Sequence, residues 1–354
     1  MNLIVSVIIP FYCTPIDLFT RCINSILSSE SDDFEIVIVN DGSPEEYNDI
    51  LLRYSADDRV FVVNNDKKGV SSARNYGMSI ARGKWIMFVD SDDYVDTTVF
   101  DSILETADNY NADILILNGS LDSNGIIKKN TLFLSEGVDY SDTDDKRIML
   151  LESAITVGIL PYGYIQSFSL GAPYCKLINT SFLENNNIKF NENVRFAEDT
   201  LLSIDLYSKA NGIYYIDKYL YFYVRNQYSV TSKYRPGLSK DMDCFFEHLE
   251  MSISNLRYAD RLNYAYYVRV QFEIGRCFNN EFFHFENRNN YKTAYLHFIS
   301  KEPYKTALNL DYLKSKGIMS KIRKYLIKSG HGNLYKWWKI ATYKQILSFI
   351  KLIL

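Results

Sequence analysis

A cluster of acidic residues follows a short apolar run in the amino-terminal half of the chain. Residues 85–89 are all apolar, and Asp90, Ser91, Asp92 and Asp93 come directly after them. Such a run predicts a buried strand of a parallel sheet that carries the acids to its carboxyl-terminal edge. If the backbone stays extended, Asp90 and Asp92 point to the same side, where two carboxylates suit a hard divalent cation and hence a diphosphate. The alternative is a turn or a helix N-cap, because Asp and Ser favour both.

Other candidate ligand-binding residues follow two more apolar runs. Pro10 and Tyr12 come at the end of the run 3–9, and Asp41 follows the run 34–39. Ligands of open α/β sheets bind outside the carboxyl ends of the strands, so these residues and the acidic cluster are expected to converge on one crevice. There a carboxylate such as Asp41 would accept hydrogen bonds from the base or ribose of a nucleotide. Taken alone, Asp41 fits an ordinary turn acid better.

A glycine-containing loop leads into a helix predicted over residues 71–81. Gly69 could let a ligand come close to the backbone, and Arg74 could reach a phosphate or order the nearby aspartates. The alternative is that Arg74 is a solvated helix residue and that Gly69 only interrupts the loop. At the other end, Gly83 is expected to terminate the helix by supplying a left-handed residue.

Alternating strands and helices are needed to bring these residues together. Apolar runs predict strands over residues 3–9, 34–39, 60–64, 85–89, 112–118 and 212–223. Helical spacing of apolar residues predicts helices over residues 16–28, 45–54, 71–81, 99–110 and 146–157. Residues 119–145 are expected to form a hairpin excursion, residues 174–211 a mixture of helix and loop, and residues beyond about 239 further helices. The pattern indicates an α/β fold with a doubly wound, mostly parallel sheet and a helical C-terminal appendage.

Composition limits the class of protein. With 354 residues, 47% of them hydrophobic, the chain can form one large domain with an appendage, or two domains. A net charge of −4 argues against a nucleic-acid partner. The five cysteines show no C-x-x-C spacing, which fits a reducing cytoplasm and argues against structural zinc or a disulfide framework. The N-terminus lacks the basic region of a signal peptide, and no apolar run reaches membrane-spanning length.

Charge is distributed unevenly toward the C-terminus. After Asp311 the sequence contains no acid, whereas lysines recur to the end together with one arginine, Arg323. From Leu334 onward a helical projection places apolar residues and Trp338 on one side and lysines largely on the other. We therefore expect residues 317–354 to bind an anionic membrane surface, with the protein peripheral at the inner face of the cell membrane. The alternative is a helix packed on the protein's own core or on a second subunit, so a homo-oligomer stays open.

Four segments, in this order, resemble the signature of family 2 glycosyltransferases with the GT-A fold. They are Val5-Ser6-Val7-Ile8-Ile9-Pro10-Phe11-Tyr12, Asn40-Asp41-Gly42-Ser43, Gly69 with Ala73-Arg74-Asn75-Tyr76-Gly77, and Asp90-Ser91-Asp92-Asp93. Residues 176–177, 196–200, 221–225 and 229–231 are more weakly similar to bacterial members that build capsule, lipopolysaccharide or cell-wall polymers. The resemblance implies a Rossmann-like GT-A catalytic domain over residues 1–238. A helical region over 239–312 and a basic amphipathic tail over 313–354 would follow it.

The resemblance also implies an activity. Such proteins transfer a sugar, hexosyl or N-acetylhexosaminyl, from a UDP-sugar to a hydroxyl of a glycan or lipid-linked acceptor. They use Mn²⁺ or Mg²⁺ and invert the configuration at the transferred carbon by single displacement. Carried over by position, Asp199 is the base that takes the acceptor's proton, Glu198 lies beside it near the acceptor, and Asp92 binds the metal. For residues 198–200 the alternative is an ordinary helix cap.

The remaining site residues are assigned to the donor by the same resemblance. Asp41 would bind the base or ribose, Asp90 would face the ribose or sugar, and Asp66 would contact uracil. The predicted donor site is completed by Pro10, Tyr12, Arg74, Ser91 and Arg225. Arg225 would close over the phosphates, or else is a solvated surface arginine. Lys176 is expected at the surface, with a place near the acceptor as the alternative.

Two other functions compete with transfer. A nucleotidylyltransferase would also use an α/β domain and a metal, but it would need a glycine-rich loop with Arg and Lys where this chain has residues 10–15. A catalytically inactive glycan-binding or scaffold protein with a GT-A domain is the second alternative, and the presence of Asp90, Asp92 and Asp199 counts against it. A dinucleotide oxidoreductase is disfavoured because no G-x-G-x-x-G follows the first apolar run.

Overall fold

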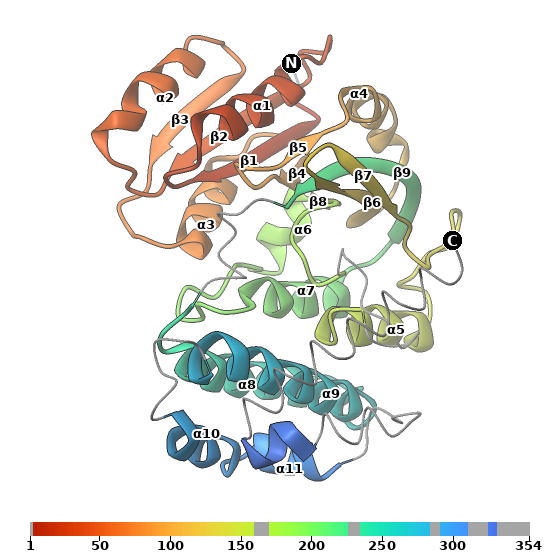
Figure 1. Cartoon of the computed structure of the whole chain (residues 1–354). Helices are drawn as coiled ribbons and strands as arrows, with labels where there is room; N and C mark the ends of the chain where they lie inside the picture. The colour runs from red at the N-terminus through yellow and green to blue at the C-terminus, as the bar shows by residue number, and fades with distance from the viewer. Residues whose placement is uncertain (1–2, 159–169, 226–233, 284–290, 311–324, 331–354) are drawn as a thin grey trace, which may run out of the picture. The chain divides into compact units, whose positions relative to one another are not determined.

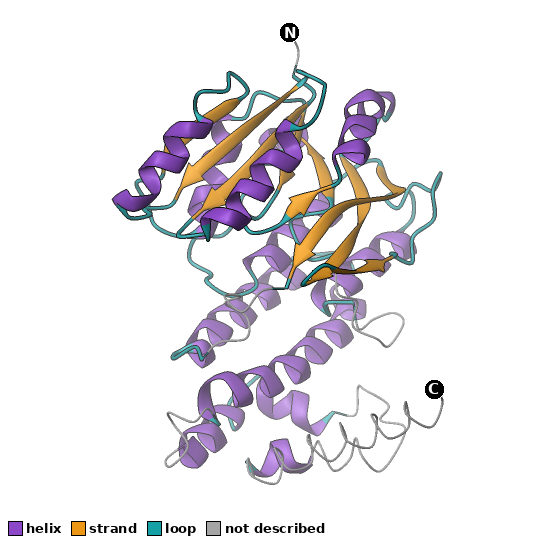
Figure 2. Cartoon of the chain, turned by 45° about the horizontal axis from the view of Figure 1, so that its top comes forward, coloured by secondary structure: helices purple, strands orange, loops and turns teal. Residues whose placement is uncertain are grey.

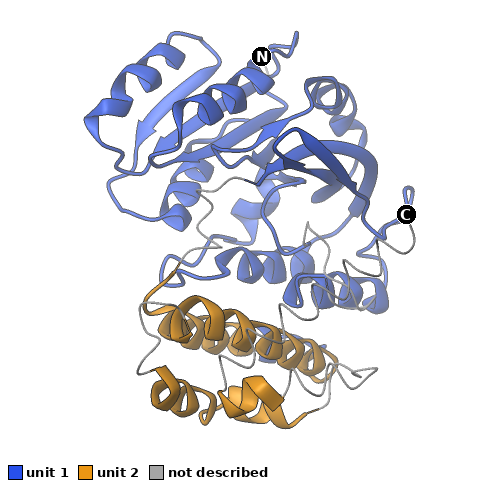
Figure 3. Ribbon diagram, viewed as in Figure 1, with its two compact units in different colours: residues 1–228, 252–258 blue, residues 229–251, 259–354 orange. Residues whose placement is uncertain are grey.

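A computed structural model of the chain describes residues 3–158, 170–225, 234–283, 291–310 and 325–330. The chain divides into two compact units, which Figure 3 shows in different colours. One unit comprises residues 1–228 and 252–258, and the other comprises residues 229–251 and 259–354. Every predicted site residue falls in the first unit. The described part of the second unit is helical, as the sequence predicts.

A parallel sheet forms the amino-terminal half of the first unit (Figure 1). Its strands are β1 (Val5–Phe11), β2 (Phe34–Asn40), β3 (Val60–Asn64) and β4 (Trp85–Phe88), and they pair in the order β3-β2-β1-β4. Strands β1 and β2 are almost entirely buried, which explains their β-branched apolar sequences. The carboxyl ends of β1, β2 and β4 therefore lie along one edge, and this edge carries Tyr12, Asp41 and Asp90.

Helices cover both faces of this sheet. On one face, Val7 and Ile9 of β1 join a core with residues of α1 (Ile16–Leu27), α2 (Asn48–Tyr54) and α4 (Thr97–Thr106). On the other face lies α3 (Val70–Ile80), where a Cβ on Gly77 would come within 2.5 Å of the Ile8 side chain. Alternate residues of β1 thus face opposite layers, as a strand requires. The predicted doubly wound α/β class is confirmed.

The sheet continues as a mixed sheet (Figure 2). Strand β8 (Lys176–Asn179) lies between β4 and β6 (Ile114–Ser123) and is antiparallel to both. Strand β9 (Ile213–Val224) runs parallel to β6, and β5 (Tyr94–Val95) pairs with β9. The predicted hairpin excursion begins with β7 (Ile126–Asn130), antiparallel to β6. The prediction of only helix and loop from residue 174 to 211 is wrong, because it contains β8.

The remaining elements are helical. In the first unit they are η1 (Glu45–Tyr47), η2 (Ala107–Asn109), α5 (Asp144–Ile155), α6 (Thr180–Asn185) and α7 (Glu198–Lys209). Further along the chain come α8 (Leu238–Ser254), α9 (Ala259–Cys277), the π-helix η4 (Phe278–Phe282), α10 (Tyr291–Ile299) and α11 (Tyr304–Asn309). Among the described residues, no helix is both long enough and apolar enough to cross a bilayer. Of the predicted membrane-binding tail, only residues 325–330 are described, so the predicted amphipathic helix from Leu334 lies outside the described residues.

Gly83 has a different role from the one expected. It does not have a positive φ, and α3 is followed by Ala81 in an extended conformation. A Cβ on Gly83 would come within 2.5 Å of the backbone nitrogen of Ser6 and 2.7 Å of the carbonyl carbon of Val5. Glycine is therefore required because the α3–β4 connection passes directly against the backbone of the central strand.

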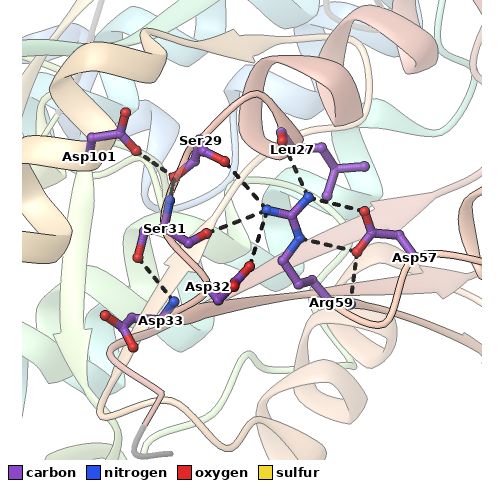
Figure 4. A network of polar contacts seen from close by, with 8 residues as sticks. All are labelled: Leu27, Ser29, Ser31, Asp32, Asp33, Asp57, Arg59 and Asp101. Atoms are coloured by element: carbon purple, nitrogen blue, oxygen red, sulfur yellow. Dashed lines mark hydrogen bonds and ion pairs between the residues drawn. The ribbon is translucent and has the colours of Figure 1, made fainter.

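Arg59 organises the opposite edge of the sheet, where the strands begin (Figure 4). Its guanidinium donates to the carbonyl oxygens of Leu27, Ser29 and Ser31 at 3.4 Å and to Asp57 at 3.1 Å. It thus satisfies carbonyls at and beyond the end of α1 that have no helical partner. A cavity of about 480 Å³ is lined by Arg59, Arg82 and neighbouring residues. Because both arginines are bonded to acids and the cavity lies at the amino edge, we do not place the ligand site there.

Candidate active site

The acidic cluster forms a turn at the carboxyl end of β4. The Asp93 N–H donates to the Asp90 carbonyl oxygen at 3.0 Å, so the extended backbone assumed for Asp90 and Asp92 is not observed and the turn alternative holds. Ser91 is buried, and its hydroxyl is 2.6 Å from that of Thr14. Thr14 follows β1, so this hydrogen bond joins the loops after β1 and β4. The two neighbouring strands therefore present a single connected edge.

Asp93 fixes the turn to the end of β9. Its carboxylate is buried and accepts hydrogen bonds from the Tyr221 hydroxyl at 2.5 Å and from the Val224 N–H at 2.7 Å. The same hydroxyl accepts a bond from the Asp90 N–H at 3.2 Å. Burial, together with the charges of Asp90 and Asp92, raises the pKa of Asp93 well above its usual value. The position of the turn is thus determined by β9 as well as by β4.

Arg74 connects this turn to the start of α7. Only 6% of its side chain is exposed, and its guanidinium donates to Asp90 at 2.9 Å and to Glu198 at 3.2 Å. It also lies 5.2 Å from the centre of the Phe190 ring. Burial lowers the pKa of Arg74, but Asp90, Glu198 and Asp199 more than compensate, so the pKa is raised overall. The solvated-helix alternative for Arg74 is therefore wrong.

Glu198 and Asp199 occupy the first turn of α7. The preceding residue, Ala197, has φ 55°, and it provides no side-chain cap. Asp199 accepts a bond from the Thr200 N–H at 2.8 Å, and 16% of the Glu198 side chain is exposed. Acids are favoured here because the helix N-terminus carries partial positive charge. Arg74 and Glu198, which are 124 positions apart, are thereby brought together. Three carboxylates, those of Asp90, Glu198 and Asp199, surround the buried Arg74 cation.

Asp41 holds the loop before α3. Its carboxylate oxygens accept from the Gly69 N–H at 3.0 and 2.9 Å, and one also accepts from the Asn65 amide at 2.8 Å. Gly69 has φ 129°, a conformation that other residues rarely adopt. Oδ1 already accepts two hydrogen bonds, but Oδ2 accepts only from the Gly69 N–H and can accept another, so these contacts are compatible with the predicted nucleotide contact. They also give Asp41 a structural role that the sequence did not reveal.

The other predicted donor residues differ in accessibility. Tyr12 and Asp66 are exposed in the loops after β1 and β3, and Pro10 is half-buried within β1. Arg225 is exposed, and its N–H donates to the Asp122 carbonyl oxygen at 2.8 Å. The rest of the segment predicted to close over the phosphates, residues 226–231, lies outside the described residues. The roles of these residues toward a donor stay predictions.

Lys176 is the residue for which the sequence was most misleading. The expected surface position is wrong, because the first residue of β8 is only 1% exposed. The sequence also failed to identify three other supports of the site: Thr14, Phe190 and Tyr221. For Lys176 the available signal was a single lysine directly before the apolar pair Leu177-Ile178. The other three contacts join residues far apart in the sequence and left no local pattern.

The acidic turn has oxygen donors suited to Mn²⁺ or Mg²⁺. Asp90 and Asp92 are both partly exposed carboxylates, the ligand type that these ions prefer. One oxygen of Asp90 is bonded to Arg74, and no cluster of three or more His, Cys, Asp or Glu residues suited to a metal occurs in the described part of the chain. The turn therefore fits an ion that is held by one or two carboxylates and completed by phosphate oxygens of a substrate.

Comparison with known proteins agrees with this geometry. Residues 6–132 match a protein family described as glycosyl transferase family 2. The chain is 30% identical over 241 residues to the uncharacterized glycosyltransferase EpsJ of Bacillus subtilis, covering 68% of this chain and 66% of EpsJ. It is 27% identical over 222 residues to the poly(ribitol-phosphate) beta-N-acetylglucosaminyltransferase TarS of Staphylococcus aureus, covering 62% of this chain and 35% of TarS. The chain thus spans less than two thirds of the length of these relatives.

The fold also has a close counterpart among solved structures. The crystal structure of S. aureus TarS 1–349 in complex with UDP-GlcNAc superposes on the chain with a TM-score of 0.60 and 21% sequence identity. The match covers 97% of this chain and 92% of that structure. The predicted GT-A-type architecture, with its helical C-terminal region, is therefore confirmed.

Proposed function

Because residues 6–132 match glycosyl transferase family 2 and the chain is similar to EpsJ, we propose that it transfers a hexosyl or N-acetylhexosaminyl group from a UDP-sugar to a hydroxyl of a glycan or lipid-linked acceptor. The choice of donor is supported by the TarS structure, which was solved with UDP-GlcNAc. The observation that carries the proposal is the bridge from Asp90 through Arg74 to Glu198. It joins the acidic turn after β4 to the helix start where Asp199 stands.

In the proposed reaction, Asp199 takes the proton of the acceptor hydroxyl while the oxygen forms a bond to C1 of the donor sugar. On the opposite face of the sugar, the bond between C1 and the diphosphate oxygen breaks, and UDP leaves with the bonding electron pair. One displacement inverts the configuration at C1. Glu198, held by Arg74 on one oxygen, would bind hydroxyl groups of the acceptor beside the base.

The donor would lie along the carboxyl edge of β1, β2 and β4. Asp41 would accept from the base or ribose, Asp66 would contact uracil, and Asp90 would face the ribose or sugar. Pro10 of β1, the exposed loop residue Tyr12 and the turn residue Ser91 would complete the nucleotide side of the proposed site, and Arg225 would approach the phosphates. Burial of Ser91 and its bond to Thr14 suggest that Ser91 contributes through its backbone.

Asp92 would hold a Mn²⁺ or Mg²⁺ ion together with oxygens of the donor diphosphate. When bound, the ion would supply positive charge that stabilises the departing diphosphate. The role of the protein here is to fix the turn. Asp93 does so through Tyr221 and Val224, so that Asp92 would meet the diphosphate at a defined position.

The cellular role is proposed from the relatives and the tail. EpsJ and TarS are bacterial glycosyltransferases, and TarS acts on poly(ribitol-phosphate) by its name. We accordingly place this chain in the synthesis of a bacterial surface polysaccharide. The lysine-rich segment after Asp311 would hold it at the cytoplasmic face of the membrane, near lipid-linked acceptors.

Substitution of Asp199 tests the proposal most directly. Asp199→Asn keeps the size of the side chain but removes the base, so UDP binding by calorimetry should persist while release of UDP from UDP-GlcNAc should fall at least about 100-fold. Asp92→Asn should instead weaken Mn²⁺-dependent UDP binding. If Asp199→Asn releases UDP at the wild-type rate, Asp199 is not the base. If the wild type binds no UDP with Mn²⁺ or Mg²⁺, the donor assignment is wrong.

A further inference from the structure

Lys176 places a charged group in the interior of the first unit. It begins β8, which is paired on both sides, and its side chain is almost completely buried. The ammonium donates to the Ala172 carbonyl oxygen and lies 5.9 Å from the centre of the Tyr207 ring. One neutral carbonyl and one ring do not compensate for the loss of hydration of a buried ammonium. Burying such a charge is costly unless an opposite charge lies close to it. The burial therefore calls for an acid nearby.

The start of α7 supplies that acid. Ser203 and Tyr207 of α7 donate to the carbonyl oxygens of Gly171 and Leu170 at 3.0 and 2.8 Å, so one face of α7 packs on the segment that leads into β8. Asp199 is four residues before Ser203 and lies on the same helical face. Consistently, Asp199 acts on Lys176 through its charge. Lys176 and Asp199 therefore lie on the two sides of the contact between α7 and the segment that leads into β8.

The groups that face this pair can be named from each packed element. Arg74 of α3 acts on Asp199 through its charge and is bonded to Glu198. Next to Lys176, burial raises the pKa of the Cys175 thiol to about 12, and burial also raises the pKa of Tyr207, so both are neutral near pH 7. On β6, the strand paired with β8, the partner of Lys176 is the apolar Ile116. Arg74 and Lys176 are therefore two cations that act on Asp199 from different elements.

We propose that Lys176 is a positioning residue for Asp199, whose buried ammonium favours the ionised carboxylate that takes the acceptor's proton. The inference rests on the proposed function, since it gives Lys176 a role only through the base. A nearby cation stabilises a carboxylate anion, so removing the charge makes Asp199 harder to ionise. Because Arg74 is already shared with Asp90 and Glu198, it does not replace Lys176.

The test is the pH profile of kcat for UDP release from UDP-GlcNAc, with water as the acceptor, between pH 4.5 and 9. Lys176→Met should move the acid limb to higher pH by about one unit, so the rate should fall by up to about tenfold at pH values below the wild-type limb and hardly change on the plateau above it. Lys176→Arg, which keeps the charge, should retain the wild-type limb. The matched control is Lys84→Met, because Lys84 is 44% exposed and pairs with Asp108 outside the site.

A wild-type acid limb in Lys176→Met, or a rate loss of equal size at every pH, would overturn the inference and leave Lys176 a structural residue. If Lys176→Met does not fold, as judged by circular dichroism, the pH profiles of Lys176→Gln and Lys176→Arg are compared instead. Both side chains can donate to the Ala172 carbonyl oxygen, but only the arginine is charged, so only Lys176→Gln should move the acid limb. Failure of the proposed function is separate, because the wild type itself would then neither bind UDP nor release it from UDP-GlcNAc. If the wild type is active and the limb does not move, only the role of Lys176 is refuted.

Discussion

Arg74→Met should destabilise the first unit because Arg74 is the buried link between two segments that are distant in sequence. The substitution keeps much of the side-chain volume but removes both charged hydrogen bonds, at 2.9 and 3.2 Å. Breaking a buried ion pair by removing one partner typically costs about 3–5 kcal/mol. Asp90, however, is 30% exposed and recovers part of its hydration, so we expect the lower end, about 3 kcal/mol.

For a unit of this size, a loss of about 3 kcal/mol corresponds to a decrease in Tm of about 6–12 °C. Arg74→Lys should lie between Arg74→Met and the wild type, because a single ammonium retains the charge but lacks the fork that reaches both carboxylates. Release of UDP from UDP-GlcNAc should fall at least about tenfold in Arg74→Met, since Asp90 and Glu198 lose their fixed positions.

Thermal unfolding followed by circular dichroism, alongside UDP release, measures both effects. Arg53→Met is the matched control, because Arg53 is exposed on α2 and its loss should change the free energy of unfolding by less than about 0.5 kcal/mol. If Arg74→Met melts at the same temperature as Arg53→Met and releases UDP at the wild-type rate, the bridge is neither a stabilising link nor a support of the site.

Three further predictions concern the same unit. Burial lowers the pKa of Lys176 to about 8, so Lys176 loses its proton at lower pH in the folded protein than in the unfolded chain. The free energy of unfolding should therefore rise by up to about 3 kcal/mol between about pH 8 and pH 10.4. Urea titrations of Lys176→Met should lack this rise. Glu35→Gln should cost about 2 kcal/mol in urea unfolding, because Glu35 accepts from the Ser6 hydroxyl and from the backbone and side chain of Arg82, yet UDP binding should not change at this opposite edge. Gly83→Ala should lower Tm by more than about 5 °C, since its Cβ would meet the backbone of Ser6; a Tm within 1 °C of wild type would contradict the close approach.

The strands of the parallel half were predictable because burial on both faces leaves a continuous apolar run. The predicted strand over residues 60–64 coincides with β3, and residues 85–89 contain β4. Strand β8 was not predictable in the same way, since it has only four residues and starts with a lysine. Its existence depends on β4 and β6, which flank it and satisfy its backbone, and no local sequence pattern encodes such an insertion.

The position of the acids could be predicted, but their partners could not. Parallel topology places the ends of β1, β2 and β4 along one edge, so Asp41 and Asp90 were expected together. Which cation each acid contacts depends on tertiary packing: Arg74 of α3 packs on Phe190 and reaches Glu198 at the start of α7. The fold also gave Asp41 the additional task of holding the Gly69 loop, which its turn-like sequence did not suggest.

The cations of the proposed site are buried and its acids are partly exposed, and this difference explains why the site suits a substrate that arrives with a bound cation. The buried cations nearest the site, Arg74 and Lys176, already act on carboxylates, whereas Asp90 and Asp92 remain partly accessible at the sheet edge. A diphosphate that approached the acidic turn alone would meet like charge, which is unfavourable at short range. With a divalent ion between them the same carboxylates become ligands, and the buried cations remain free to set the geometry of Asp90, Glu198 and Asp199. In the proposed reaction, the accessible acids would hold the donor through the ion, and the buried cations would position the groups that activate the acceptor.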